Sequence, residues 1–356
     1  MKKHWQQAAS GIECCFIAPN GITGVMRTLA TRKEIAKIAG VSERTVYRAL
    51  NNMPEVSDAT REKIQNIARR FGYQPNAIAQ ALVRRETRTL GIIVGDCSHP
   101  FYAPTIRSIS ETASEHDYTV FLCNTGYDDL SLFVKAVNDL TAKKVDGLLI
   151  LPVPNTDSEI EILKARGIPV VLINRYVERH AFDCVYSDNQ FGGYELTKHL
   201  ISLGHRNIAY IDHCYTSSAA RDRFSGFQKA MSEQGLREDL RFEADYRSQT
   251  AIYDVVRQIL NQNHKVTAIF AYNDLMAIYV MRALKEAGVR IPDEMALVGY
   301  DNIAMAELLD ISLTSVDQSP YEVGVEATRL LLKQIKDPGP ARQIAFKPQI
   351  IIRASS

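Results

Sequence analysis

Five side chains suited to DNA contacts lie close together between residues 43 and 48. Arg44 and Arg48 carry guanidinium forks that meet O6 and N7 of guanine together, and Glu43 accepts a hydrogen bond from the cytosine amine. Tyr47 adds an aromatic ring, and Thr45 suits a phosphate or a thymine methyl group. These residue types at this spacing predict a helix face that enters the major groove of a DNA duplex.

Three short helices are predicted to hold that face in place. Thr31 and Glu34 form a capping box at the start of the first helix, and Gly40 ends it because glycine adopts a left-handed turn at little cost. Ser42 is the N-cap of the second helix. Two helices across a glycine turn, closed by a third, are typical of a helix-turn-helix, and a three-helix bundle that binds protein is the alternative. The predicted helices cover residues 31–40, 42–50 and 57–72.

Charge is distributed unequally along the chain. Residues 26–85 carry 12 Lys and Arg against 5 Asp and Glu, a net charge of +7, whereas residues 86–356 carry 28 against 35, a net charge of −7. A basic head on an acidic body favours a polyanionic partner such as nucleic acid. The alternative is a solvated positive face that has no partner.

Length and composition limit the class of protein. The 356 residues suggest two or three domains. Apolar residues make up 46% and charged residues 23%, which excludes collagen-like, disordered and disulfide-scaffold chains. The longest apolar runs fall far short of the roughly 20 residues that a membrane span needs. Neither a P-loop, nor G-x-S-x-G, nor H-E-x-x-H occurs, and the histidines lack ligand-pair spacing, so we predict no enzyme activity, metal or cofactor.

The first 25 residues differ from the rest. They show neither helical periodicity nor capping signals, so we expect either an extension without fixed structure or a misassigned start, with translation beginning at Met26. Gln6, Gln7 and Glu13 interrupt any apolar core of a secretory signal. The six cysteines contain no C-x-x-C pair and fit reduced thiols. The protein is therefore expected in the cytoplasm.

A short helical segment follows the basic head. Pro75 restricts the backbone φ angle at the start of the segment, Asn76 can act as an N-cap, and residues 77–83 have high helix propensity. Seven residues are too few for a stable isolated helix in water. We expect this segment to become ordered only when something packs against it.

From Thr31 to about Arg353 the chain resembles the lac repressor (LacI/GalR) family of bacterial transcription regulators. The head keeps the family signature with its spacing, at Ile35-Ala36-Lys37-Ile38-Ala39-Gly40-Val41-Ser42, Thr45-Val46, Arg48, Asn51, Val56-Ser57, Thr60-Arg61, Ile64, Gly72-Tyr73 and Pro75-Asn76. The resemblance implies an effector-controlled DNA-binding protein. The expected DNA contacts are Thr31, Ser42, Glu43, Arg44, Thr45, Tyr47, Arg48, Asn51, Asn76, Ala79 and Leu82.

The resemblance also implies that the segment after Pro75 is a hinge helix that folds on operator DNA. Two hinge helices of a dimer insert paired leucines into the minor groove; by position this leucine is Leu82, with Ala79 at the contact between the helices. Tyr47 departs from the pattern, since most members have a small serine there, so the operator preference of the family is in doubt. The segment after Arg353 is too short for a tetramer-forming leucine heptad tail, which favours a dimer.

The rest of the chain alternates between strand and helix patterns. This alternation predicts an α/β fold of doubly wound parallel sheets with ligands at the carboxyl ends of the strands. Strands are predicted at 90–94, 119–123, 147–151, 169–173, 207–212, 242–244, 267–271 and 296–299, and helices at 103–117, 129–143, 157–166, 190–203, 219–235, 250–261 and 273–287. The resemblance to a two-lobed periplasmic-binding-protein (type I) core implies a cleft and three crossovers. The predicted boundaries are 26–74 for the helix-turn-helix domain, 75–87 for hinge and linker, 88–186 with 317–344 for lobe 1, and 187–316 with 345–356 for lobe 2.

Polar side chains at the predicted strand ends should meet in the cleft. Carboxylates, amides and a forked arginine bind vicinal hydroxyls, while flat rings cover the C–H face of a sugar. By resemblance, Arg223 and Asp301 are the main candidates; a local salt bridge or helix cap is the alternative. The candidate effector-binding residues are Phe101, Tyr102, Asn124, Asn174, Asp188, Arg221, Arg223, Tyr246, Asn273 and Asp301.

These patterns predict a dimeric regulator, most simply a repressor, of a carbohydrate-utilisation operon. It binds a near-palindromic operator under the control of a small-molecule effector, with a sugar as the family default. A purine or nucleoside effector is one alternative, and a small-molecule-binding protein of the same fold without DNA regulation is another. Whether the effector releases or promotes DNA binding stays open, because that sign depends on which dimer geometry the effector prefers.

Overall fold

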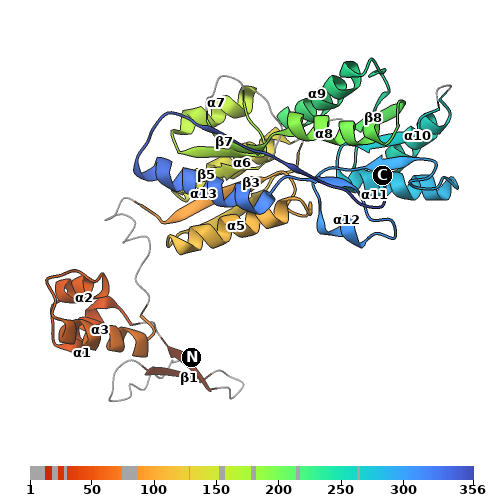
Figure 1. The fold of residues 1–356 in the computed structure, drawn as a ribbon. Coiled ribbons are helices and arrows are strands. Elements are labelled where there is room, and N and C mark those ends of the chain that lie inside the picture. The colour runs from red at the N-terminus through yellow and green to blue at the C-terminus, as the bar shows by residue number, and fades with distance from the viewer. Residues whose placement is uncertain are drawn as a thin grey trace. The chain divides into compact units, whose positions relative to one another are not determined.

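The computed structural model describes residues 13–17, 23–27, 30–73, 86–127, 129–151, 157–177, 182–213, 217–262 and 265–356. The chain divides into two compact units, a head (Met1–Arg85) and a body (Glu86–Ser356), shown in Figure 1. None of the helices that the structure describes is both long and apolar enough to cross a lipid bilayer.

Two antiparallel strands precede the helices of the head, β1 (Glu13–Ile17) and β2 (Thr23–Arg27). Glu13 pairs with Arg27, and Ile17 with Thr23. Residues 13–17 and 23–25 therefore lie in strands, whereas the expectation for residues 1–25 was an extension without fixed structure or a misassigned start. That expectation rested on missing helical periodicity, whereas the run from Cys14 to Ile17 is rich in residues that favour strands.

The head contains the three predicted helices, α1 (Arg32–Ala39), α2 (Glu43–Leu50) and α3 (Asp58–Arg70). The capping box at Thr31 is present, and Gly40 follows α1 with a φ of 72°, as predicted. Ile35, Val46 and Ile64, one from each helix, are completely buried in a small shared core. The helix-turn-helix prediction is confirmed.

Lobe 1 of the body is built on a six-stranded sheet in the order β13-β7-β6-β5-β3-β4, with every described pair parallel. The strands are β3 (Thr89–Val94), β4 (Thr119–Asn124), β5 (Gly147–Ile150), β6 (Val170–Ile173), β7 (Asp183–Ser187) and β13 (Gln343–Phe346). Helices α5 (Tyr102–Glu115) and α13 (Pro320–Lys336) cover one face, and α6 (Leu130–Ala142) and α7 (Asp157–Arg166) the other (Figure 1). The doubly wound sheet is as predicted.

Lobe 2 repeats this plan on a smaller parallel sheet in the order β11-β10-β8-β9. Its strands are β8 (Ile208–Asp212), β9 (Arg241–Glu243), β10 (Ala268–Ala271) and β11 (Ala296–Val298). Its helices are α8 (Asn189–Ser202), α9 (Ser218–Glu233), α10 (Gln249–Leu260), α11 (Asp274–Glu286) and the short α12 (Ala304–Leu308). Helices α8 and α9 pack on one face of the sheet, and α10 and α11 on the other.

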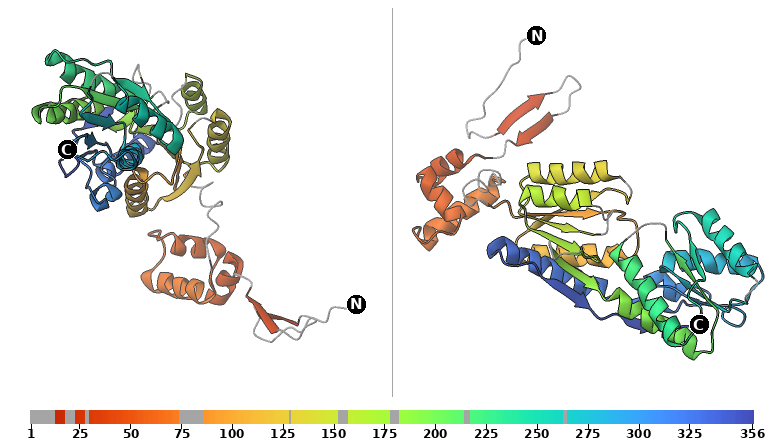
Figure 2. Two further views of the ribbon diagram at one scale, coloured as in Figure 1. Left: turned by 90° about the vertical axis from the view of Figure 1, so that its right-hand side faces the viewer. Right: turned by 90° about the horizontal axis from the view of Figure 1, so that it is seen from above.

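The chain crosses between the lobes three times. It leaves lobe 1 after β7, returns after β12 (Ser315–Asp317), and leaves again between β13 and β14 (Gln349–Ile351). Strands β12 and β14 pair antiparallel beside the crossings, with Val316 opposite Ile350. Figure 2 shows these blue C-terminal segments running between the two lobes. The crossings place the carboxyl ends of several strands near one another.

Several elements were not predicted. They are β7, α12, β12, α13, β13 and β14. The strands among them have only three to five residues, which makes local periodicity a weak signal. Strands β12, β13 and β14 pair with segments far away in the sequence, whereas β7 pairs both with the preceding β6 and with the distant β13. Helix α13 could have been predicted, because its buried residues Val323, Ala327 and Leu330 recur at helical spacing.

Candidate functional site

The helix predicted to read base pairs, α2, is fixed by caps at both ends. The Ser42 hydroxyl accepts a hydrogen bond from the Thr45 amide (3.1 Å), and the Asn51 side-chain amide donates to the Tyr47 carbonyl (2.7 Å). On α1, Thr31 accepts from the Glu34 amide (3.3 Å). Thr31, Ser42 and Asn51 therefore have local structural roles, and their contacts with DNA stay a prediction.

The side chains predicted to contact bases lie on the outer surface of α2. Glu43 and Arg44 are exposed, and Tyr47 and Arg48 are half-buried. Val46 and Ala49, on the opposite face, are completely buried in the core of the head. The core thus fixes the rotation of α2 about its axis, and the arginines point away from it. The predicted contacts Asn76, Ala79 and Leu82 lie outside the described residues.

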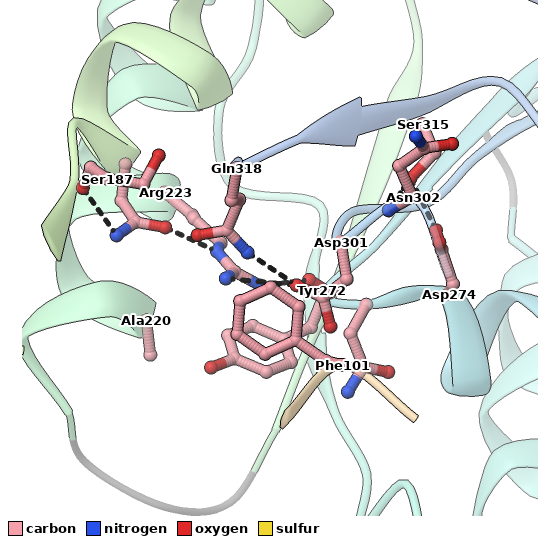
Figure 3. Close-up of polar contacts among 12 residues, drawn as sticks. Phe101, Ser187, Ala220, Arg223, Tyr272, Asp274, Asp301, Asn302, Ser315 and Gln318 are labelled. Carbon is pink, nitrogen blue, oxygen red and sulfur yellow. Dashed lines mark hydrogen bonds and ion pairs between the residues drawn. The ribbon is translucent and has the colours of Figure 1, made fainter. Parts of the chain in front are cut away.

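A buried ion pair lies where the strands of lobe 2 meet the crossings. Arg223 on α9 donates from Nη2 to Asp301 Oδ1 (3.3 Å), from Nε to Asn189 Oδ1 (2.8 Å) and from Nη1 to the Tyr272 carbonyl (2.9 Å). Gln318 Nε2 donates to the same Asp301 oxygen (2.7 Å). Figure 3 shows these groups converging on the carboxylate. Arg223 and Asp301, each predicted as an effector contact, therefore form the local salt bridge that was the alternative for these residues, and both side chains are 5% exposed. Their contact with an effector stays a prediction.

Close helix packing and backbone geometry place this pair. A Cβ at Gly193 of α8 would collide with the Arg223 carbonyl, so glycine lets α8 and α9 approach closely enough for Arg223 to reach Asn189. Asp301 follows β11 and has a φ of 110°, a conformation that side chains rarely adopt. The Arg223 guanidinium also lies 3.8 Å from the centre of the Tyr300 ring.

A second buried carboxylate, Asp274, stands beside the ion pair. Its Oδ1 accepts from the Ser315 hydroxyl (2.6 Å) and its Oδ2 from the Ile303 amide (2.9 Å). Burial, reinforced by the charge of Asp301, raises the pKa of Asp274 to about 8. Burial also raises the pKa of Asp301 to about 6, although Arg223 opposes that shift. Near pH 7 Asp274 is therefore mostly protonated, and Asp301 balances Arg223.

Aromatic rings from both lobes form the apolar part of the site. His99 of lobe 1 lies 5.3 Å from Tyr102 and 5.6 Å from Tyr246 of lobe 2, and Phe101 lies 5.3 Å from Tyr102, measured between ring centres. His213 of lobe 2 lies 6.5 Å from Tyr246. Burial lowers the pKa of His99 to about 4 and that of His213 to about 3, so both are uncharged at neutral pH.

Two of the predicted asparagines, Asn174 and Asn273, are also buried. Asn273 caps α11 by accepting from the Met276 amide (2.9 Å), and its Nδ2 lies 3.5 Å from Nε2 of His99 on the other lobe. Asn174 follows β6 with a φ of 55° and is 4% exposed. Neither its side-chain nitrogen nor its oxygen has a hydrogen-bond partner in the described structure. A buried amide without partners is costly unless a ligand or water pairs with it.

Three predicted effector contacts have local partners instead. Asn124 accepts from the Cys97 amide (2.8 Å), Asp188 caps α8 by accepting from the Phe191 amide (2.9 Å), and exposed Arg221 donates to the Tyr176 hydroxyl (2.9 Å). These contacts fit the cap and local-bond alternative, and none of them links the three residues to the Arg223–Asp301 pair. Their role with an effector stays a prediction.

Sequence reasoning missed several residues of the cluster. They are Asn189, Gln318, Tyr272, His99 and His213. Tyr272 lies between the end of the predicted strand 267–271 and the predicted Asn273, and Asn189 directly follows the predicted Asp188. The rule that ligand-binding residues follow the ends of strands could therefore have included both. Gln318 could not be found that way, because the strand before it, β12, was not predicted.

Two family models match nearly the whole described chain. Residues 31–76 match the model described as bacterial regulatory proteins, lacI family. Residues 87–350 match the model described as periplasmic binding proteins and sugar binding domain of LacI family. The first match covers the three helices of the head, and the second covers the body.

Whole-chain comparisons agree with these models. The chain is 33% identical over 331 residues to the HTH-type transcriptional repressor PurR of Vibrio parahaemolyticus, covering 91% of this chain and 98% of that one. It is 29% identical to the transcriptional regulator CelR in its cellobiose complex, with a TM-score of 0.71 over 92% of this chain and 100% of that one. The lac repressor dimer bound to operator shares 24% identity and the same fold, with a TM-score of 0.85 over 92% and 99%.

Proposed function

The chain belongs to the LacI family of bacterial transcription regulators, and we propose that its effector is an uncharged sugar and its target a carbohydrate-utilisation operon. As a member, it is a DNA-binding transcriptional repressor with a separate effector-binding domain and not an enzyme. Because it acts on DNA, we place it in the bacterial cytoplasm.

The balance of charge in the site supports an uncharged ligand. Arg223 is neutralised by Asp301, and His99 and His213 have pKa values lowered to about 4 and 3 by burial. Asp274 is mostly protonated near pH 7 because burial raises its pKa to about 8. A phosphate or carboxylate would meet no uncompensated cation among these residues, and burying it would be unfavourable.

The unpartnered amide of Asn174 is the observation that carries the proposal. A carboxamide both donates and accepts, and one that is buried without partners matches a ligand hydroxyl, which also does both. The neutral imidazole of His99 accepts from the Phe101 amide through Nδ1 (3.3 Å), and its Nε2 lies 3.5 Å from Nδ2 of Asn273. Neutral polar groups beside aromatic rings favour a ligand with many hydroxyls and an apolar face.

Ring geometry favours a sugar over a planar base. The described ring pairs among His99, Tyr102, Tyr246 and His213 meet at 47°, 81° and 85°, so these pairs do not form a parallel slot for a purine. A purine effector is nevertheless the second candidate, because the similar repressors from Vibrio carry the name PurR. CelR, in contrast, is described in complex with cellobiose.

A ligand panel tests the choice of effector. We expect thermal unfolding of the full chain to shift upward with one or more neutral mono- or disaccharides, because a ligand that binds only the folded state stabilises it. Sugar phosphates, purine bases and nucleosides should leave the midpoint unchanged. A shift with purines alone would replace the sugar by a purine effector, and a shift with phosphorylated sugars alone would refute the uncharged ligand.

Substitution of Asn174 sharpens that test. Asn174→Gly keeps a residue that tolerates positive φ but removes the amide, so the sugar-induced shift should disappear. Asn302→Gly is the matched control: Asn302 also has a positive φ (49°), but its side chain bonds Asp317 (2.7 Å) and Arg353 (2.8 Å). The control should lower unliganded stability and keep the sugar-induced shift.

The proposed dimer places two heads on one operator. LacI-family repressors act as dimers, and β4 lies at the end of the six-stranded sheet with an apolar surface beside it. Phe121, Leu122 and Leu132 of β4 and α6 are 39%, 46% and 45% exposed. We propose that a second copy covers them. Leu122→Glu should yield monomers by light scattering and weaken operator binding; a dimer with full affinity would exclude this surface.

A further inference from the structure

The outer surface of α2 carries two parallel rows of side chains. Glu43 and Tyr47 are four residues apart and form one row, and Arg44 and Arg48 form the next. The rows differ in charge, since one contains two cations and the other a carboxylate and a ring. Carboxylates are repelled by the phosphates of a duplex, so the first row needs a neutralising partner if it is to approach DNA.

Arg32, the first residue of α1, supplies that partner. Its Nε lies 3.5 Å from Glu43 Oε2, and its Cζ lies 5.9 Å from the centre of the Tyr47 ring. One guanidinium from a different helix therefore contacts both members of the first row. The ring contact fixes one side of the guanidinium, and the carboxylate contact fixes its edge.

The pair is accessible, unlike the ion pair of the body. The side chains of Arg32 and Glu43 are each 47% exposed, so both keep polar atoms that face outward. A guanidinium donates to guanine O6 and N7, and a carboxylate accepts from the cytosine amine. Guanine and cytosine of one base pair present these groups next to each other in the major groove, as Arg32 and Glu43 present theirs on the head.

We propose that Arg32 is a specificity-determining residue and that Arg32 and Glu43, supported by Tyr47, read a single C·G base pair of each operator half-site as a unit. Arg44 and Arg48 read other positions. The proposal rests on the DNA-binding function of the head and adds to it a base-reading residue that lies outside the recognition helix. It also gives Tyr47 a role, which is to support Arg32 rather than to enter the groove.

Selection of half-sites tests the proposal. The full chain is equilibrated with duplexes that carry randomised operator half-sites, and the bound fraction is sequenced to give the base preference at each position. Arg32→Ala and Glu43→Gln should each reduce the preference for C·G by about tenfold at one shared position. The double variant should reduce it no further than Arg32→Ala alone, whereas Arg44→Ala should act at a different position.

The controls separate base reading from general charge. Lys33→Ala removes an exposed cation beside Arg32 and should leave every base preference unchanged. Thermal unfolding of each variant verifies that the head is folded. Equal weakening by Arg32→Ala on all sequences, with a salt dependence reduced by about one phosphate contact, would overturn the proposal. Effects of Arg32→Ala and Glu43→Gln at different positions would also overturn it, and a wild-type chain without any sequence preference would refute DNA reading by the head altogether.

Discussion

The head and the body each contain an arginine beside a carboxylate and a tyrosine ring, but in opposite surroundings. In the head, Arg32 and Glu43 are 3.5 Å apart and each 47% exposed. In the body, Arg223 and Asp301 are 3.3 Å apart and each 5% exposed. The distances barely differ, whereas the exposure to water differs about tenfold. The comparison therefore isolates what burial does to one chemical motif.

Burial converts a loose pair into a fixed one. Water screens the pair of the head, so it contributes little to stability and its members can exchange partners when DNA approaches. The pair of the body has lost that water, and Asn189, Gln318 and the Tyr272 carbonyl supply fixed hydrogen bonds in its place. The exposed motif suits the reading of a varied surface, and the buried motif suits a preorganised ligand site.

The largest effect is expected from breaking the buried pair. Arg223→Met leaves the Asp301 carboxylate buried without its cation, which should lower the free energy of unfolding of the body by about 3–5 kcal/mol. The loss should be larger at pH 8 than at pH 6, because protonation of Asp301, whose pKa burial raises to about 6, relieves the unpaired charge at acid pH. Urea unfolding at both pH values measures it.

The exposed pair Arg257–Asp254 on α10 is the matched control. Its side chains are 70% and 61% exposed, so Arg257→Met should leave the urea midpoint unchanged. A loss below about 1 kcal/mol for Arg223→Met would contradict the view that the protein depends on this pair for stability.

A smaller effect, on binding rather than folding, is expected for an exposed cation of the head. Arg44 is exposed on α2, so Arg44→Ala should leave stability unchanged and weaken operator binding by about 1–3 kcal/mol at one base pair. Gel-shift titrations against operators with single base changes measure the loss. Uniform weakening on every sequence would show that Arg44 contacts phosphate instead of a base edge.

The protonation of Asp274 should make the stability of the body depend on pH. The pKa of Asp274 is about 8 in the folded body and near 3.8 in the unfolded chain, so the folded state binds this proton more tightly. The stabilisation is complete below the unfolded pKa and is lost as the pH rises through about 8. Between pH 7 and pH 9 the body should lose about 1–2 kcal/mol.

Urea unfolding across that range checks the effect, and Asp274→Asn should abolish it. His99 and His213 interfere little, because their lowered pKa values of about 4 and 3 keep them neutral in the folded state, and the ordinary histidine pKa of about 6.5 leaves them mostly neutral above pH 7 in the unfolded chain. Asp254→Asn, at an exposed carboxylate on α10, should keep the full pH dependence. An unchanged slope in Asp274→Asn would assign the proton to another group.

The local rules of capping and periodicity were sufficient for the three helices of the head, although not for β1 and β2. Thr31 and Ser42 cap the first two helices as predicted, and Ser57 caps the third, whose start was predicted there; each cap bonds a residue only three positions away. The alternation of strands and helices in the body was also predicted, because the periodicity of each segment is a local signal. The strands β12, β13 and β14 were not, since they pair with partners distant in sequence, and the five-residue β7 was missed although it pairs with the neighbouring β6.

The ligand site was predictable only in part. Residues that follow a predicted strand, such as Asn174 and Asn273, could be placed at its carboxyl end, and both are buried. The resemblance singled out Arg223 and Asp301 as effector contacts, but their ion pair with each other was only the alternative. Residues brought in by the crossings, such as Gln318, and histidines such as His99 required the three-dimensional structure, because no local pattern shows which loops meet. Arg32 was missed for the same reason, since its partner lies on the next helix.

The smallest effect, the coupling within the exposed pair, completes the comparison. A double-mutant cycle of Arg32→Met and Glu43→Gln in thermal unfolding should give a coupling of about 0.2–1 kcal/mol. The coupling should shrink when the salt concentration is raised from about 0.05 M to about 0.5 M, because the Debye length falls as the ionic strength rises. A cycle of Arg223→Met and Asp301→Asn should give a larger coupling that salt leaves nearly unchanged, since no counterion reaches side chains that are 5% exposed. Equal salt sensitivity of the two cycles would mean that solvent reaches the buried pair. In that case the contrast between an adaptable surface pair and a preorganised buried pair would fail.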